Sequence, residues 1–144
     1  MTKTENERRT GLGFLLARAH GAVRQRVAAV LEGSGLHLGH VAILGMLAEQ
    51  GSTQAALCAA TGIEKSSMVL FVDALEQGGW VERQRHPSDR RAYLVVLTSA
   101  GRNRLAELGP RLAAAEDGAL AVLSAAELDL LANMLGRLVD GKAG

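Results

Sequence analysis

Apolar residues recur at helical spacing through the first half of the chain. They do so from Leu12 to Leu31, from about Leu38 to Glu49, from about Thr53 to Ala60 and from about Glu64 to Gln77. Side chains three and four positions apart share one face of a helix, so the pattern predicts four amphipathic helices. Thr61-Gly62 separates the last two, which gives a helix, a tight turn and a second helix.

In the fourth predicted helix, four apolar side chains stand at positions i, i+3, i+4 and i+7, and we expect them to face the core. These residues are Met68, Phe71, Val72 and Leu75. Ser52 is the predicted N-cap of the preceding helix, and Gly78-Gly79 is predicted to close the fourth.

The apolar spacing then changes to one typical of strands. Trp80 to Arg85 and Ala92 to Leu97 are predicted strands, the second because it is β-branched and apolar. Between them lies His86 to Arg91, a charged segment rich in turn-forming residues. This order predicts a β-hairpin with a basic tip, and we call residues 80–97 the wing.

Two further helices are predicted after the wing. Thr98 is the expected N-cap of a helix that runs through Leu105 and Leu112, and Gly109-Pro110 is expected to kink or break it. Ser124 and Glu127 have the spacing of a capping box for the last helix. That helix carries one apolar stripe, made of Leu128, Leu131, Leu135 and Leu138.

The predicted fold is mainly α with a small β-hairpin. Residues 1–144 form a single domain in this interpretation, with a winged helix-turn-helix core at residues 36–98. The flanking helices, at residues 10–33 and 99–141, have wide apolar faces that one chain cannot cover. Two chains that pack these faces together would bury them, so we expect a homodimer.

The composition excludes some classes of protein but does not identify the function. The 144 residues are 48% apolar and 22% charged, which predicts a folded chain rather than a disordered one. The net charge of +1 does not indicate a general polyanion binder, so a nucleic-acid site must come from a local cluster. The chain has a single cysteine, Cys58, and no internal disulfide is possible. We recognise no apolar segment typical of a signal peptide and no apolar run of membrane-spanning length. We therefore expect a cytoplasmic protein without a membrane partner.

The wing supplies such a cluster. Residues 83–91 contain four arginines against the single acid Asp89, a local charge of +3; the arginines are Arg83, Arg85, Arg90 and Arg91. A narrow basic loop suits a DNA minor groove, where the negative potential is concentrated. We expect Asp89 to hold an arginine guanidinium in one rotamer. The alternative is a solvated hairpin whose arginines serve solubility.

The fourth predicted helix is the candidate for the major groove. If its apolar stripe faces the core, then the residues that face outward are Lys65, Ser66, Ser67, Val69, Leu70 and Asp73. Lysine and hydroxyl groups contact phosphates and base edges, and apolar side chains contact thymine methyl groups. A generic surface helix is the alternative, but it does not explain two outward apolar residues.

Several segments resemble the MarR family of transcriptional regulators. They are Gly62 to Met68, Val72 to Arg83, His86 to Ala92 with its Asp-Arg-Arg-Ala sequence, and Leu97 to Gly101 with Leu-Thr-x-x-Gly. The order of elements is similar from about Leu12 to Leu138.

The resemblance implies a homodimer that binds a palindromic operator. It implies that the recognition helix enters the major groove, that Arg91 enters the minor groove and that Asp89 steadies it. It also implies regulation by a small molecule, a metal or an oxidant. Many members carry a basic residue where Leu70 or Ala74 stands, so this chain departs from the pattern at these positions.

The resemblance leaves three kinds of regulation, by an oxidant, by a metal ion or by a small organic molecule. Cys58 lies in the first helix of the helix-turn-helix, and we expect a buried structural thiol rather than a redox sensor. His37 and His40 stand three positions apart, but a closed zinc site needs four ligands, so no metal site is predicted. An unidentified small organic effector is the remaining option, with Arg18, His20, His37 and His40 as its candidate contacts.

The sequence therefore predicts a DNA-binding regulator, which is a repressor in this interpretation. Its predicted partners are duplex DNA, a second copy of the chain and a small effector. No cofactor is predicted. Two alternatives stay open: a winged-helix module that binds protein, and a metal-responsive or redox-responsive version of the same regulator. Paired carboxylates, a nucleophile motif and a phosphate-binding loop are not recognisable, so no enzyme is predicted.

Overall fold

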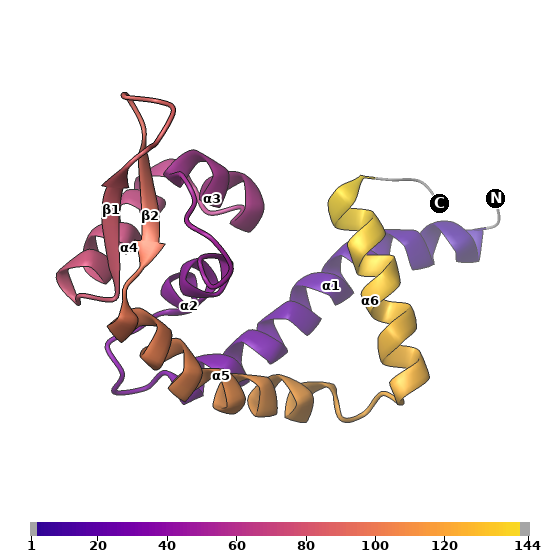
Figure 1. Cartoon of the computed structure of the whole chain (residues 1–144). Helices are drawn as coiled ribbons and strands as arrows, with labels where there is room; N and C mark the ends of the chain where they lie inside the picture. The colour runs from indigo at the N-terminus through magenta and orange to yellow at the C-terminus, as the bar shows by residue number, and fades with distance from the viewer. Residues whose placement is uncertain (1–2, 142–144) are drawn as a thin grey trace. The chain divides into compact units, whose positions relative to one another are not determined.

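The computed structural model describes residues 3–141, with side chains described from Gly11 onward. It contains six helices and one two-stranded hairpin, which confirms the predicted fold class (Figure 1). In order, they are α1 (Lys3–Val30), α2 (Leu38–Met46), α3 (Gln54–Thr61), α4 (Lys65–Gln77), β1 (Val81–Arg85), β2 (Tyr93–Leu97), α5 (Ser99–Leu120) and α6 (Ala125–Asp140).

The chain divides into two compact units. The first runs from Val27 to Leu112 and contains α2, α3, α4, the hairpin and the first part of α5. The second is made of the described residues before Val27 and after Leu112. Residues 36–98, the predicted winged helix-turn-helix, all lie within the first unit.

The hydrophobic core belongs to the first unit. Its buried apolar residues are Leu31, Leu36, Ile43, Leu44, Leu47, Leu57, Met68, Val72, Leu75, Val81, Val95, Leu97 and Leu108. Three of them come from α4, and Phe71 packs against the cluster while partly exposed. The predicted core face of α4 is therefore confirmed, and the opposite face of this helix is left to solvent.

The hairpin strands pair in antiparallel register, from Val81 opposite Leu97 to Arg85 opposite Tyr93. Ser52 adds an isolated bridge to Val95, with the Ser52 N–H donating to the Val95 oxygen at 3.0 Å and the reverse bond at 2.8 Å. The prediction of Ser52 as the N-cap of α3 is wrong because this backbone pairing occupies it. Thr53 caps the helix instead, since its side-chain oxygen accepts the Ala56 N–H at 3.2 Å.

Gly101, in the first turn of α5, lies against the backbone of Trp80, the residue that precedes β1. A Cβ built there would stand 2.0 Å from the Trp80 carbonyl oxygen, so only glycine fits. The Gly101 N–H donates to the Thr98 side-chain oxygen at 3.0 Å, which confirms Thr98 as the cap of this helix.

Two helix boundaries differ from the sequence pattern. α1 begins at Lys3 rather than Leu12, because the polar stretch before Thr10 consists mostly of residues with good helix propensity and needs no apolar face. α2 ends at Met46 rather than Glu49. The backbone tightens there, as the Ala48 N–H donates to the Gly45 oxygen three residues back.

The predicted break at Gly109-Pro110 is wrong. α5 runs from Ser99 to Leu120 with Pro110 inside it. Proline removes one backbone N–H from the helix, whereas Leu108 is buried and Leu112 packs against the core on either side. Packing of these leucines favours a continuous helix despite the proline.

The second unit leaves its apolar side chains exposed. Among its described residues none is buried, and Phe14 of α1 and Val139 of α6 are 66% and 86% exposed. Ser124 and Glu127 form the predicted capping box at the start of α6. The Ser124 N–H donates to the Glu127 carboxylate at 2.8 Å, and the Glu127 N–H donates to the Ser124 hydroxyl oxygen at 3.3 Å. The start of α6 is thus encoded locally.

No single helix in residues 3–141 is long and apolar enough to cross a membrane; two sharply bent helix pairs reach that length and composition only when joined.

Candidate nucleic-acid interface

The solvent face of α4 carries the residues predicted to meet DNA. Lys65, Ser66, Val69 and Leu70 are exposed, and Ser67 is half-buried. The core face of the same helix holds them in place, because Met68, Val72 and Leu75 are fully buried. Glu64 is the N-cap but makes no side-chain capping bond, so the first-turn N–H groups beside Lys65 are not occupied by that side chain.

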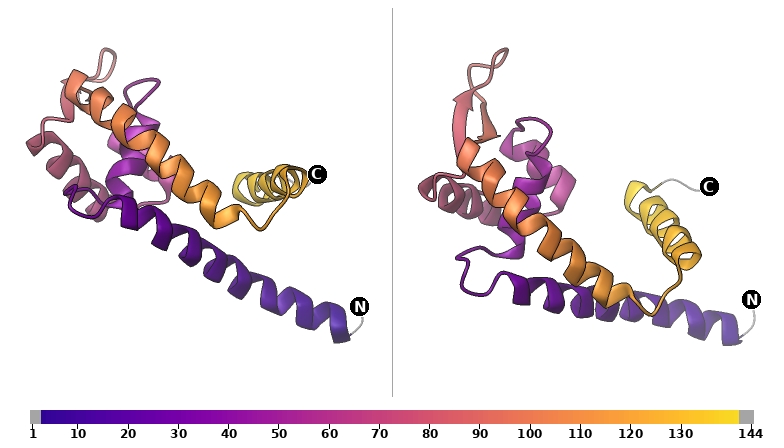
Figure 2. Two further views of the ribbon diagram at one scale, coloured as in Figure 1. Left: turned by 90° about the horizontal axis from the view of Figure 1, so that it is seen from below. Right: turned by 60° about the horizontal axis from the view of Figure 1, so that its bottom comes forward.

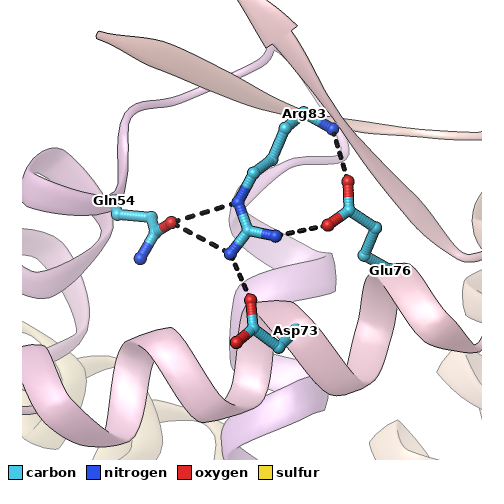
Figure 3. A network of polar contacts seen from close by, with 4 residues as sticks. All are labelled: Gln54, Asp73, Glu76 and Arg83. Carbon is cyan, nitrogen blue, oxygen red and sulfur yellow. Dashed lines mark hydrogen bonds and ion pairs between the residues drawn. The ribbon is translucent and has the colours of Figure 1, made fainter. Parts of the chain in front are cut away.

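A polar network joins the base of the wing to α4 and α3 (Figure 3). The Arg83 guanidinium on β1 donates to Asp73 of α4 at 2.5 Å and also to the Glu76 carboxylate. It reaches the side-chain oxygen of Gln54 on α3 at 3.2 and 3.4 Å. The Arg83 backbone N–H donates to Glu76 at 3.2 Å. One side chain therefore connects three elements of the unit.

Arg83 differs in this respect from the other wing arginines. Burial by itself would lower the pKa of Arg83, but the hydrogen bonds to Asp73 and Glu76, and the charges of these two carboxylates, raise it above its usual value. The guanidinium stays charged and two carboxylates neutralise it. Its predicted contact with DNA therefore competes with a role inside the protein.

The wing loop is held by its own side chains. His86 Nδ1 accepts the N–H groups of Ser88 at 3.2 Å and Asp89 at 3.1 Å. The Ala92 N–H closes the loop onto the Asp89 carbonyl oxygen at 3.1 Å. Because Nδ1 acts as an acceptor, any imidazole proton sits on Nε2 in the neutral form. The loop extends away from the helices of its unit (Figures 1 and 2).

Asp89 acts on the backbone rather than on a guanidinium. Its carboxylate accepts the Arg91 N–H at 2.9 Å, and none of the ion pairs among the described side chains involves it. The expectation that Asp89 holds an arginine rotamer is therefore corrected: a separation of two residues favours a turn in which aspartate bonds the backbone N–H ahead of it. Arg91 is steadied at its main chain, and its side chain stays free to turn.

Three wing arginines are exposed and unpaired among the side chains that the structure describes: Arg85, Arg90 and Arg91. With Asp89 the only acid in the loop, this leaves a local excess of positive charge on a narrow hairpin. Such a surface attracts the phosphate backbone, and its focus at a tip suits a groove.

The candidate effector residues lie in both units. In the second unit, Arg18 and His20 are exposed on α1, and the Arg18 guanidinium stands 5.9 Å from the centre of the Phe14 ring. In the first unit, His37 and His40 lie together with ring centres 5.4 Å apart. Their joint role in an effector site stays a prediction.

His40 is the unusual member of that pair. It is 5% exposed, its Nδ1 accepts the His37 N–H at 2.9 Å, and its ring meets Phe71 edge-on. Its Nε2 is buried without a partner among the described residues. Burial, and then the charge of His37, lower the pKa of His40, so the neutral ring is favoured.

Within the described part of the chain, no three histidine, cysteine, aspartate or glutamate side chains are grouped as metal ligands would be. Cys58 is half-buried on α3 and packs against the core.

Sequence reasoning missed Gln54, Glu76 and His86, and placed Asp73 only on the outward face of α4. The signal for His86 was local, since a side chain just before a turn can accept the turn's N–H groups. No comparable signal existed for the network, because Gln54 and Arg83 are 29 residues apart and only the fold brings them together.

The known proteins that this chain resembles are transcriptional regulators. A family model described as the MarR family matches residues 34–92. A candidate transcriptional regulatory protein for the hcr operon of Thauera aromatica is 33% identical over 129 residues, covering 88% of this chain and 78% of that protein.

Solved structures agree over most of the chain. CouR from Rhodococcus jostii RHA1, solved with p-coumaroyl-CoA, is 30% identical with a TM-score of 0.83, covering 92% of this chain and 94% of that one. A MarR-family transcriptional regulator from Rhodococcus sp. RHA1 is 26% identical with a TM-score of 0.85, covering 100% of this chain and 99% of that one.

Proposed function

Because the chain belongs to the MarR family of transcriptional regulators, we propose that it is a repressor that binds a palindromic operator as a homodimer and leaves it when a small effector binds. α4 enters the major groove and the wing enters the adjacent minor groove. Two copies would place their recognition helices roughly 34 Å apart, which matches half-sites one helical turn apart.

The wing carries this proposal. Arg85, Arg90 and Arg91 are exposed and have no carboxylate partner in the described residues. Arg85 ends β1, and Arg90 and Arg91 stand on the loop that His86 and Asp89 hold. An ordered loop loses less conformational entropy on binding than a mobile one. Phosphate contacts from Arg85, Arg90, Lys65, Ser66 and Ser67 would fix the register, with Arg91 in the minor groove.

The second unit supports the homodimer. Its described apolar side chains are exposed on α1 and α6; the most exposed include Leu12, Phe14, Leu15, Leu130, Leu138 and Val139. A monomer that exposes so many large apolar side chains on two helices is unfavourable in water, and a second copy covers them by symmetry. A mass measurement in solution tests this part directly.

The effector is proposed to be a small organic acid or its thioester. Its candidate contacts are His37 and His40 in the first unit and, separately, Arg18 and His20 in the second. CouR, at 30% identity, was solved with p-coumaroyl-CoA, so aromatic acids and their coenzyme A thioesters are the first compounds to test. The Arg18 guanidinium suits an anionic group, and an imidazole N–H donates a hydrogen bond to a carbonyl or carboxylate oxygen.

The test of DNA binding uses the region upstream of the protein's own gene. Footprinting should reveal a protected palindrome, with affinity falling steeply as salt rises because several phosphates are neutralised. Arg91→Ala should weaken binding at least tenfold while leaving the dimer intact.

Arg111→Ala is the matched control, since Arg111 is also an exposed arginine of the first unit but lies on α5. Equal affinity of the Arg91 and Arg111 variants would refute the role of the wing. No protected sequence at any salt concentration would refute operator binding and favour a module that binds protein.

A further inference from the structure

Leu70 stands at the centre of the solvent face of α4. Its side chain is 69% exposed, and that of its neighbour Val69 is 38% exposed. Met68, Val72 and Leu75 fill the core from the other side of the helix. No packing inside the described unit accounts for a large apolar side chain there, so Leu70 is free to contact a partner outside the chain.

The surroundings of Leu70 are nearly free of charge. One turn before it stands Ser66, and one turn after it stands Asp73, whose carboxylate the Arg83 guanidinium holds at 2.5 Å. Glu76 is paired with the same guanidinium. The network in Figure 3 thus draws both acids of the helix toward β1, which leaves the middle of the face to a hydroxyl and two apolar side chains.

The rest of α4 offers few groups that distinguish bases by paired hydrogen bonds. Its one cation is Lys65, at the first position, and its one amide is Gln77, at the last. Arginine and asparagine do not occur in this helix, although they make the paired contacts with guanine and adenine. The middle of the helix therefore offers DNA mainly apolar contact.

One group on the base edges of the major groove is apolar, the 5-methyl of thymine. Leu70 against a phosphate or a polar base edge would strip water from that group without replacing its hydrogen bonds. We propose that Leu70, with Val69 beside it, reads thymine methyl groups, so that each operator half-site carries a thymine at the position facing this pair. This inference rests on the proposed entry of α4 into the major groove.

The test compares thymine with deoxyuridine, which pairs identically and keeps the O4 acceptor but lacks the methyl group. Duplexes that the full-length protein enriches from a random library supply the probe. Thymines of the enriched half-site are then replaced by deoxyuridine one position at a time, in both half-sites together. Burying one methyl group changes affinity about fourfold, so the critical position should cost the dimer about fifteenfold.

Two variants complete the cycle. Leu70→Ala should lose most of that discrimination and bind the thymine and deoxyuridine duplexes within about twofold of each other. Gln77→Ala, on the same helix, should discriminate as the natural protein does. Because Leu70 is exposed, the alanine variant should melt at the temperature of the natural protein, which shows that the loss is not one of folding.

The possible results separate the two proposals. Indifference of the natural protein to deoxyuridine at every position, enrichment of half-sites without thymine, or full discrimination by Leu70→Ala would each overturn methyl recognition while specific binding remains. If the library yields no enriched sequence, operator binding itself fails, and methyl recognition fails with it.

Discussion

Replacing Arg83 with methionine separates a contact with DNA from a contact inside the protein. Methionine keeps a long apolar side chain and removes the guanidinium that joins Asp73, Glu76 and Gln54. We expect Arg83 to act as a positioning residue that holds β1 against α4 and neutralises the two acids beside the solvent face of α4, which is proposed to read DNA.

The expected loss of stability is modest. The Arg83 side chain is 23% exposed and its partners Asp73 and Glu76 are 46% and 40% exposed, so solvent screens both ion pairs. Pairs of this kind contribute about 0.2–1 kcal/mol each. The free energy of unfolding should therefore fall by about 1 kcal/mol, which lowers Tm by about 3–5 °C in a protein of this size.

The decisive assay is operator affinity as a function of salt concentration. Arg83→Met alone leaves two acids without their partner and should weaken binding. Adding Asp73→Asn returns the charge of the face to its original value, so affinity should recover although the lost stability does not. The slope of log affinity against log salt should then equal that of the natural protein.

A direct phosphate contact predicts a different slope. Each lost phosphate contact lowers the slope by about 0.9, so a dimer that loses two contacts changes by about 1.8. If Arg83→Met with Asp73→Asn stays weak and shows this smaller slope, Arg83 binds DNA and the positioning role is refuted. Gln77→Ala serves as the control for a change elsewhere on the same helix.

Two other predictions concern stability. Gly101→Ala should destabilise the fold by about 3 kcal/mol or more, because its Cβ meets the Trp80 oxygen at 2.0 Å. Gly45→Ala is the control, because a Cβ there has nothing within 4 Å, and it should stabilise the fold slightly. Equal denaturation midpoints for the two variants would contradict the close packing at Gly101. Folding lowers the pKa of His40, so its neutral ring contributes its full stabilisation above the pKa of the unfolded chain, about 6.5. This stabilisation is lost as the pH falls through the pKa of the folded protein. His40→Gln should reduce the fall in unfolding free energy between about pH 8 and about pH 5. His20→Gln, at an exposed position, is the control and should follow the natural protein. Parallel stability curves for all three proteins would show that His40 does not control this pH dependence.

Much of the fold could be predicted from the sequence because it is encoded locally. The apolar spacing in α4 determined its core face, since Met68, Val72 and Leu75 can be buried together in only one rotation of a helix. The capping box of Ser124 and Glu127 determined where α6 begins, because the two residues lie three positions apart. The exposed arginines of the wing were likewise evident, because a turn segment between two short strands lies at the surface.

The sequence failed where residues distant along the chain decide the outcome. Ser52 looked like a helix cap, but pairing with Val95 took its backbone. Pro110 looked like a helix end, but core packing of Leu108 and Leu112 favours continuing the helix. In both cases a local preference of roughly 1–3 kcal/mol was outweighed by contacts that exist only once the chain has folded.

The candidate site divides in the same way. The sequence by itself determined that α4 presents Leu70 to solvent and that the wing is basic, because helical period and local charge are properties of neighbouring residues. Only the tertiary structure decided which charges remain available to DNA. It brings Arg83 onto Asp73 and Glu76, and a salt bridge depends on distance in space rather than on separation along the chain.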